Sequence, residues 1–269
     1  MINIKTKDLI LRNGGFISTE SFGSSENNET GNIASGAGGD VIVNASNAVT
    51  ILDGEGITAQ TSGTGNAGNI TINTGLLTIQ NGGVITVASY EDGAGKAGNL
   101  IINATQAVNL MGADSMLSAT GDGLRPAGSL TIKTGNLNVS DGAQVTVNNT
   151  KGQAGNLNIY ADNLFLDRGF LTAETAETGI DGANINLQLS NLLKMQNESL
   201  ISAQARGGAN GGNVTINSPL LAVLLPTGPN GSDIIAKAEE GSGGNILINS
   251  QGMFGTTEGK AIAGNQSND

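Results

Sequence analysis

Residues Gly68–Ser89 read GNITINTGLLTIQNGGVITVAS and contain three short runs in which apolar and polar residues alternate. The apolar pairs of the three runs are Ile70/Ile72, Leu77/Ile79 and Ile85/Val87. Alternation places the apolar side chains of each run on one face, as in a half-buried β-strand. The segments between the runs, Asn-Thr-Gly and Asn-Gly-Gly, contain residues that accept left-handed backbone angles. The stretch therefore predicts one closed coil of three strands and three corners.

The same unit recurs along the whole chain. A polar residue precedes the first strand of successive units, with spacings of 27 to 32 residues, at Asp40, Asn69, Asn99, Ser129, Asn156, Asn184, Asn213 and Asn245. Apolar pairs equivalent to all three runs follow in nearly the same register. A fixed period of this length is typical of a solenoid. We predict an all-β fold, a parallel β-helix of about nine coils of three short strands, roughly 40 Å long.

The composition agrees with a solenoid rather than with a compact globular core. Glycine accounts for 42 of the 269 residues, and it follows the long repeat instead of the three-residue period of collagen. Aromatic residues make up only 3% of the chain. A β-helix needs few of them, because each inward Ile, Leu or Val packs on its equivalent one coil away.

Charge and residue types exclude several classes of function. Twelve basic and 23 acidic residues give a net charge of −11, which opposes binding to nucleic acid or to an anionic membrane. The chain has no Cys and no His, so it lacks thiolate metal ligands and the commonest general base. No apolar run approaches the ~20 residues of a membrane span, and the start, MINIKTKDLIL, does not resemble a signal peptide.

One repeat from end to end predicts a single domain. We place the β-helix at residues 1–255, with a polar loop insertion at 22–39, and a polar C-terminal tail at 256–269. Met1 falls in a column that Asn holds elsewhere, so we expect the chain to be a fragment that continues upstream coils. A first coil without a cap would expose Ile2, Ile4, Leu9 and Leu11, and it predicts end-to-end self-association.

Polar residues recur at two corners of the repeat. The corner after the second strand holds Asn13, Asp53, Asn81, Asp141 and Asn197. The corner after the first strand holds Asn44, Asn73, Asn103, Asn217 and Asn249. We predict that the first column stacks and satisfies backbone groups of the turns, with metal binding as the alternative, and that the second column is an internal or corner Asn ladder.

The outward positions at the centres of the strands contain no acidic residue. A polysaccharide-active enzyme would need carboxylates that converge on one strand face, so we predict that the chain is not an enzyme and has no catalytic residue. The outward column of the third strand is almost entirely hydroxylic, with Ser18, Thr58, Thr86, Ser118, Thr146, Thr172 and Ser202. Cross-coil packing explains this column. An ice-binding surface is the alternative.

Acidic residues gather instead at and after the third strand. Among them, weak candidates for calcium binding are Glu91, Asp92, Asp122, Glu174 and Asp181. A solvated acidic edge that keeps the solenoid soluble is the simpler interpretation. No other metal or cofactor is predicted.

Two strings, GTGNAG at Gly63–Gly68 and GAGKAG at Gly93–Gly98, match the dinucleotide-binding pattern GxGxxG. That pattern requires a strand before it and a helix after it, so that the phosphate lies at the helix N-terminus. Here a predicted strand follows, and similar corners recur in most coils. We interpret both strings as corners.

The recurrent unit, and especially SDIIAKAEEGSGGNILINSQGMFG at Ser232–Gly255, resembles the repeat region of filamentous haemagglutinin-like exoproteins of the two-partner secretion pathway, notably the cyanobacterial ones. The resemblance covers nearly the whole chain. It implies a right-handed parallel β-helix, export through an outer-membrane transporter, and an extracellular or cell-surface location. We therefore expect a structural or adhesive repeat segment with surface glycans as possible ligands. A polysaccharide-binding or polysaccharide-active β-helix protein is the alternative.

Overall fold

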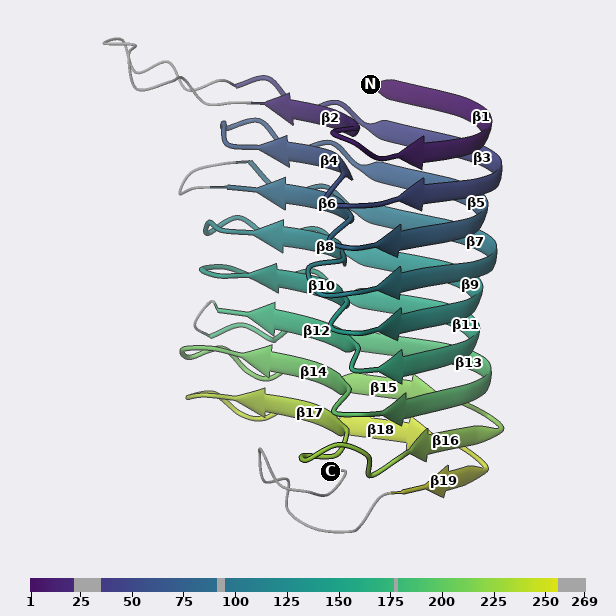
Figure 1. Ribbon diagram of the computed structural model, residues 1–269. Coiled ribbons are helices and arrows are strands. Elements are labelled where there is room, and N and C mark those ends of the chain that lie inside the picture. The colour runs from purple at the N-terminus through teal and green to yellow at the C-terminus, as the bar shows by residue number, and fades with distance from the viewer. Residues whose placement is uncertain (22–34, 91–94, 177–178, 256–269) are drawn as a thin grey trace.

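The computed structural model describes residues 1–21, 35–90, 95–176 and 179–255. The described residues form parallel β-sheets and turns, contain no helix, and build a β-solenoid of about seven turns (Figure 1). This confirms the predicted all-β, parallel β-helical class. The predicted tail at 256–269 and residues 22–34 of the predicted insertion lie outside the described residues.

Each of the seven turns consists of one long and one short strand. The long strands are β1 (Ile2–Leu11), β3 (Val41–Ile51), β5 (Ile70–Gln80), β7 (Leu100–Met111), β9 (Leu130–Ser140), β11 (Leu157–Asp167) and β13 (Ile185–Gln196). The short strands are β2 (Phe16–Ser21), β4 (Gly56–Thr61), β6 (Val84–Ser89), β8 (Met116–Gly121), β10 (Gln144–Asn149), β12 (Phe170–Thr175) and β14 (Leu200–Ala205).

Equivalent strands pair in parallel from one turn to the next. The long strands form one sheet in the order β1-β3-β5-β7-β9-β11-β13, and the short strands form a second sheet. Ile70 lies opposite Leu100, and Leu100 lies opposite Leu130. All three side chains are fully buried, so the interior is built from stacked aliphatic columns as predicted. Burial of each such side chain stabilises the fold by about 1.5–3 kcal/mol.

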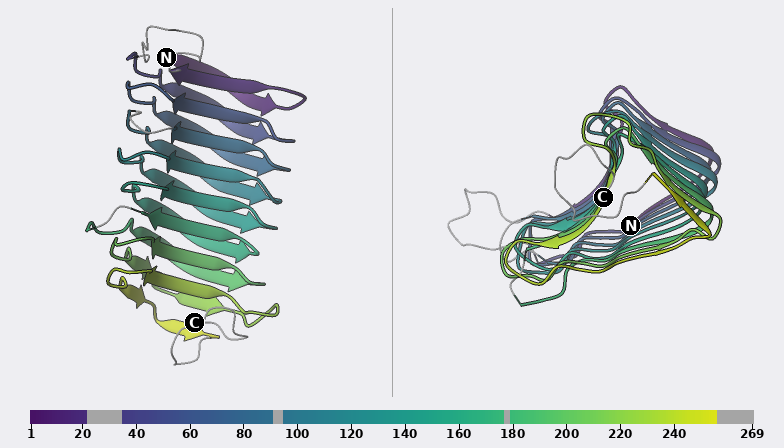
Figure 2. Two further views of the ribbon diagram at one scale, coloured as in Figure 1. Left: turned by 90° about the vertical axis from the view of Figure 1, so that its left-hand side faces the viewer. Right: turned by 90° about the horizontal axis from the view of Figure 1, so that it is seen from below.

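The prediction of three short strands per coil is wrong. The first and second predicted strands form one long strand that bends without ending, as the three-sided outline in Figure 2 shows. Neither Asn73 nor Gly75 has a positive φ, so the chain stays extended through the predicted corner, and a shift of register marks the bend. Gly75 is required for another reason: a Cβ there would lie 2.6 Å from the carbonyl oxygen of Asn47.

The predicted count of nine coils is also wrong, because the strands after β14 are short and less regular. They are β15 (Val214–Asn217), β16 (Leu221–Leu224), β17 (Asp233–Ala238), β18 (Ile246–Asn249) and β19 (Gly252–Phe254). Pro219 interrupts the long strand between β15 and β16, because proline has no N–H to donate to the ladder. Ile246 is exposed, whereas its equivalents Ile70, Leu100 and Leu130 in the regular turns are fully buried. Counting apolar pairs in the sequence therefore gave more coils than the regular turns that the structure contains.

Glycines at the corner before the long strands β3, β5, β7, β9 and β11 allow the turns to stack closely, and Ala183 holds this position before β13. A Cβ built on Gly98 would lie 1.9 Å from the carbonyl oxygen of Gly68, and one built on Gly128 would lie 1.7 Å from that of Gly98. The second GxGxxG match ends at Gly98, and the strand β7 follows it. Close contact between the backbones of neighbouring turns therefore explains the repeated glycines. This agrees with the interpretation of the GxGxxG strings as corners. Within the described residues no helix is long and apolar enough to cross a membrane.

Candidate functional site

A continuous polar ladder runs along the corner where each long strand begins. We call it the corner ladder, and its members are Asp40, Asn69, Asn99, Ser129, Asn156, Asn184, Asn213 and Asn245. The side-chain oxygen of each member accepts a hydrogen bond from the backbone N–H of the next, at 2.8–3.1 Å. The ladder has no gap in these eight positions. It satisfies corner N–H groups that the sheets do not use, and its role is structural.

A second ladder follows the bend of the long strands. We call it the bend ladder, and in register its positions are Asn44, Asn73, Asn103, Lys133, Tyr160, Gln188, Asn217 and Asn249. Side-chain amides donate to the preceding member at 2.6–3.0 Å over the first three and the last three positions. The predicted Asn ladder is confirmed in two separate groups, Asn44 with Asn73 and Asn103, and Asn217 with Asn249. Lys133 and Tyr160 interrupt the ladder in its middle.

The surface is hollowed along the bend ladder. Four shallow depressions follow one another from the second turn to the last described strands, and neighbours share lining residues. Thr105 belongs to the first and second depressions, Lys133 to the second and third, and Gln188 to the third and fourth. Together they form one open groove, which we call the bend groove. It runs along the solenoid axis.

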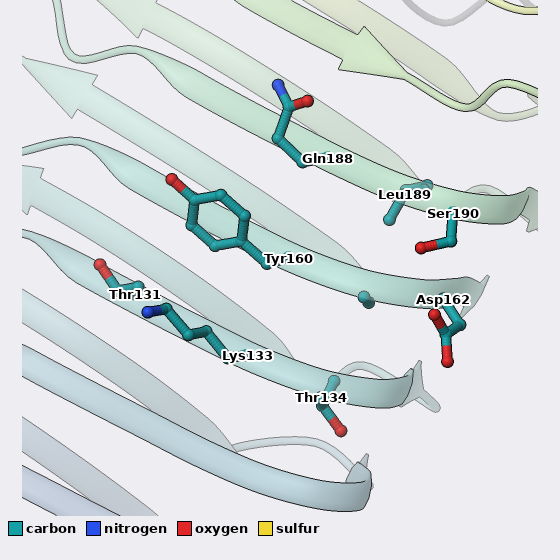
Figure 3. A pocket seen from close by; sticks show the side chains of 9 residues that line it. Thr131, Lys133, Thr134, Tyr160, Asp162, Gln188, Leu189 and Ser190 are labelled. Carbon is teal, nitrogen blue, oxygen red and sulfur yellow. The ribbon is translucent and has the colours of Figure 1, made fainter.

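Of the four depressions, the one where the bend ladder is interrupted has the largest volume, and we call it the widest depression. The depression there has a volume of about 800 Å³, compared with about 320 to 480 Å³ for the other three. Tyr160 on β11 lies between Lys133 on β9 and Gln188 on β13, and the broad face of its ring is turned toward the viewer in Figure 3. The Tyr160 side chain is 46% exposed. An aromatic ring thus forms part of the floor, beside Ala161, Leu189 and several polar side chains.

The charges in this widest depression nearly cancel. Its lining consists of Thr131, Lys133, Thr134, Tyr160, Ala161, Asp162, Gln188, Leu189 and Ser190. Lys133 Nζ lies 5.8 Å from the centroid of the Tyr160 ring, within the range of a cation–π contact. Asp162 sits at a shift of register between Ala161 and Asn163, where a bulge turns its side chain to the groove. The remaining polar groups are neutral amides and hydroxyls.

The sequence prediction missed Lys133, Tyr160 and Gln188 as members of this site. The signal was present in the register, because the three residues occupy the positions of the Asn column in successive turns. The three residues are not asparagine, so the predicted Asn column did not include them.

The predicted column after the second strand is confirmed as a turn column. Its five members, Asn13, Asp53, Asn81, Asp141 and Asn197, all have left-handed φ angles of 53–59°. Arg168 takes the same conformation in another turn and pairs with Asp141. The Asp141 carboxylate thereby raises the pKa of the Arg168 guanidinium above its usual value. These contacts hold neighbouring turns together and bring no set of metal ligands into one place.

A carboxylate near this column has a perturbed pKa. Partial burial favours the neutral form of Asp167, but hydrogen bonds from Asn197 and Gln196 and the charges of Arg168 and Lys194 outweigh it. The pKa of Asp167 is therefore below its ordinary value. This is the pattern of a carboxylate in a structural network.

The three predicted calcium ligands that the structure describes each bond to a different residue. Glu91 and Asp92 lie outside the described residues. Asp122 accepts a hydrogen bond from Thr150, and Asp181 accepts one from Asn210. Glu174 forms an ion pair with Arg206. In the described ranges, no group of three or more Asp, Glu, His or Cys side chains could hold a metal ion.

The hydroxyl column of the short strands is largely buried. Thr58, Thr86, Ser118, Thr146 and Ser202 are at most 7% exposed. Their hydroxyls bond across turns, as between Thr86 and Ser118 at 2.7 Å. Figure 2 shows that the short-strand sheet curves inward between the other two sides of the outline. The cross-coil interpretation is confirmed, whereas a flat exposed ice-binding face is excluded for these residues.

Comparisons with protein-family models, with curated proteins and with solved structures found no match to this chain.

Proposed function

We propose that this chain is a non-catalytic structural and adhesive segment of a secreted or cell-surface exoprotein. The observation that carries the proposal is the bend groove, an open surface of mixed polar and apolar residues that follows the solenoid axis over most of the described turns. Stacked aliphatic columns and an unbroken corner ladder make the support behind it rigid. A rigid rod with a lateral contact surface is suited to adhesion.

The chemistry of the groove supports binding rather than turnover. Most glycoside hydrolases use two carboxyl groups on either side of the bond that breaks. Asp162 is the one carboxylate among the described residues that line the widest depression. Lys133 lies beside Tyr160 in the same depression. The groove therefore provides contact groups but lacks the paired acid and base of a hydrolase.

The resemblance of the repeat unit to filamentous haemagglutinin-like exoproteins supports a surface location. On that resemblance we propose a right-handed winding, upstream coils in a longer chain, and export through an outer-membrane transporter. The right hand agrees with the rule for parallel crossover connections and with the path of the chain in Figure 1. Of the four apolar residues expected to be exposed in the first turn, Ile2, Ile4 and Leu9 are only partly buried, whereas Leu11 belongs to the buried core.

Retention on surfaces, measured together with sugar release, tests the function. Purified protein is applied to bacterial cells and to polysaccharide-coated beads, and bound protein and newly formed reducing ends are quantified in the same samples. We expect retention without new reducing ends. Release of reducing ends that disappears in Asp162→Asn would overturn the non-catalytic assignment. Absence of retention on every surface would overturn the adhesive one.

A further inference from the structure

We infer that the bend groove binds an extended, unbranched, neutral polysaccharide, and that one sugar ring stacks on Tyr160. This inference rests on the adhesive function proposed above and names the ligand class of its contact surface. It is carried by the shape of the groove, the exposed ring in its floor and the types of polar groups along it.

The shape of the groove selects a linear polymer. Four connected depressions run parallel to the solenoid axis, and equivalent side chains recur once per turn along it. One turn advances by about 4.8 Å, the spacing of neighbouring strands. A pyranose unit in an extended chain advances by a similar length. Successive sugars can therefore meet equivalent amides in successive turns.

The side chains match sugar hydroxyls. Amides such as Asn103 and Gln188 carry both donors and acceptors, and the hydroxyls of Thr134 and Ser190 do so as well. The flat ring of Tyr160, turned outward and 46% exposed, offers an apolar surface to the C–H face of a sugar. A groove with one aromatic platform among neutral polar groups has the chemistry of a carbohydrate subsite.

Charge selects a neutral polymer over an acidic one. The lining of the widest depression contains one positive residue, Lys133, and one negative residue, Asp162, so its formal net charge is zero. The chain as a whole carries −11 and repels polyanions. Lys133 lies beside the Tyr160 ring, where its position also fits a hydrogen bond to a sugar hydroxyl.

A peptide fits this groove less well. Extended peptides usually bind by adding a strand to an open sheet edge. The groove lies over the faces of β9 and β11, and each of these strands is already paired with a neighbour on both sides. Side chains, rather than backbone groups, are therefore available for contact.

The two tyrosines allow a direct test, because the chain has no Trp. In Tyr90→Phe the single remaining tyrosine is Tyr160, so tyrosine fluorescence reports on the groove. In Tyr160→Phe it is Tyr90, which is 41% exposed and does not line the groove. Both variants are titrated with cellohexaose, mannohexaose and hexagalacturonate, and affinities are confirmed by calorimetry. We expect the neutral hexamers to change the emission of Tyr160 and to leave that of Tyr90 unchanged.

Affinity measurements on truncated side chains and shorter ligands complete the test. We expect Tyr160→Ala to bind the preferred neutral hexamer about tenfold more weakly, whereas Tyr90→Ala retains wild-type affinity. Dimers of the same sugar should bind more weakly than hexamers. Circular dichroism checks that each variant is folded, and Tyr160→Phe, which keeps the ring, should bind nearly as well as the wild type.

Three results would overturn the inference: preference for hexagalacturonate, equal affinity of Tyr160→Ala and wild type, or no change in Tyr160 emission with any hexamer. If the protein is retained on cells while Tyr160 emission stays unchanged, adhesion uses another face. That outcome removes the groove as the site but leaves the adhesive function standing.

Discussion

The corner ladder and the bend ladder differ in one respect that separates structure from function. Both place one polar side chain per turn in register along the solenoid. The first seven members of the corner ladder each accept a bond from the backbone N–H group of the next member. Members of the bend ladder bond to one another's side chains. Lys133 and Tyr160 can therefore interrupt the bend ladder without leaving a backbone group unpaired.

The difference teaches where this fold tolerates variation. A residue that satisfies a corner backbone group is constrained in every turn. A residue whose side chain faces solvent over an already paired strand is free to acquire other chemistry. The widest depression lies where Lys133 and Tyr160 replace the amides of the bend ladder.

The largest effect is expected from Gly128→Ala at the corner. The new Cβ would lie 1.7 Å from the carbonyl oxygen of Gly98, so the turns must separate. We expect a loss of about 2–3 kcal/mol in the free energy of unfolding, measured by urea denaturation. Gly36→Ala is the matched control, because its Cβ would meet no atom within 4 Å. Similar stability of the two variants would show that close stacking at this corner is not required.

A smaller loss is expected from breaking the corner ladder itself. In Asn99→Ala the backbone N–H of Ser129 loses its acceptor, which we expect to cost about 1 kcal/mol. Asn73→Ala in the bend ladder removes bonds between side chains only, so its cost should be smaller. Thermal unfolding of both variants measures the contrast. A greater loss for Asn73→Ala would reverse the assigned roles of the two ladders.

Placing amides at the two interrupted positions of the bend ladder should abolish ligand binding without lowering the free energy of unfolding. The double variant Lys133→Asn/Tyr160→Asn restores an amide at both positions, and amides already stack at equivalent positions. We expect the free energy of unfolding to stay within about 0.5 kcal/mol of the wild type or to rise slightly. Binding of the neutral hexamers should be lost. Unfolding of the variant under native conditions would show that the two residues are structural.

The smallest effect concerns pH and the network around Asp167. Its pKa is lowered in the folded protein, so its contribution to stability is present above the pKa of the unfolded chain and is lost as pH falls through the folded pKa. We expect Asp167→Asn to lose less stability than the wild type between about pH 5 and pH 2. Urea denaturation at a series of pH values measures the slopes. Identical slopes would show that this carboxylate adds nothing to the pH dependence.

The stacked interior and the polar columns could be predicted from sequence because they are fixed by the period. Ile70, Leu100 and Leu130 recur at one position of the repeat, and so do the asparagines of both ladders. The bend at Asn73–Gly75 could not be predicted, because Asn and Gly favour turns in general and only the neighbouring backbone shows why Gly75 is needed. Burial of Thr86 depends on the curvature of the short-strand sheet, which local alternation does not encode.

The site was harder to predict than the fold. Tyr160 and Lys133 are single departures from a repeated column, and a repeat search favours residues that conform. Side chains from three successive turns line the depression around Tyr160 and Lys133. The sequence alone does not show this depression, because it forms only when the turns stack.

Mapping of the ligand contacts by NMR tests the central claim most directly. Backbone and side-chain resonances of the wild-type protein are compared with and without the preferred neutral hexamer. We predict that the shifts concentrate on Lys133, Tyr160 and Gln188 and on the amides of the bend ladder, while the corner ladder and the short-strand sheet remain unchanged. Shifts confined to the corner ladder or to the short-strand sheet would contradict the assignment of the bend groove as the binding surface.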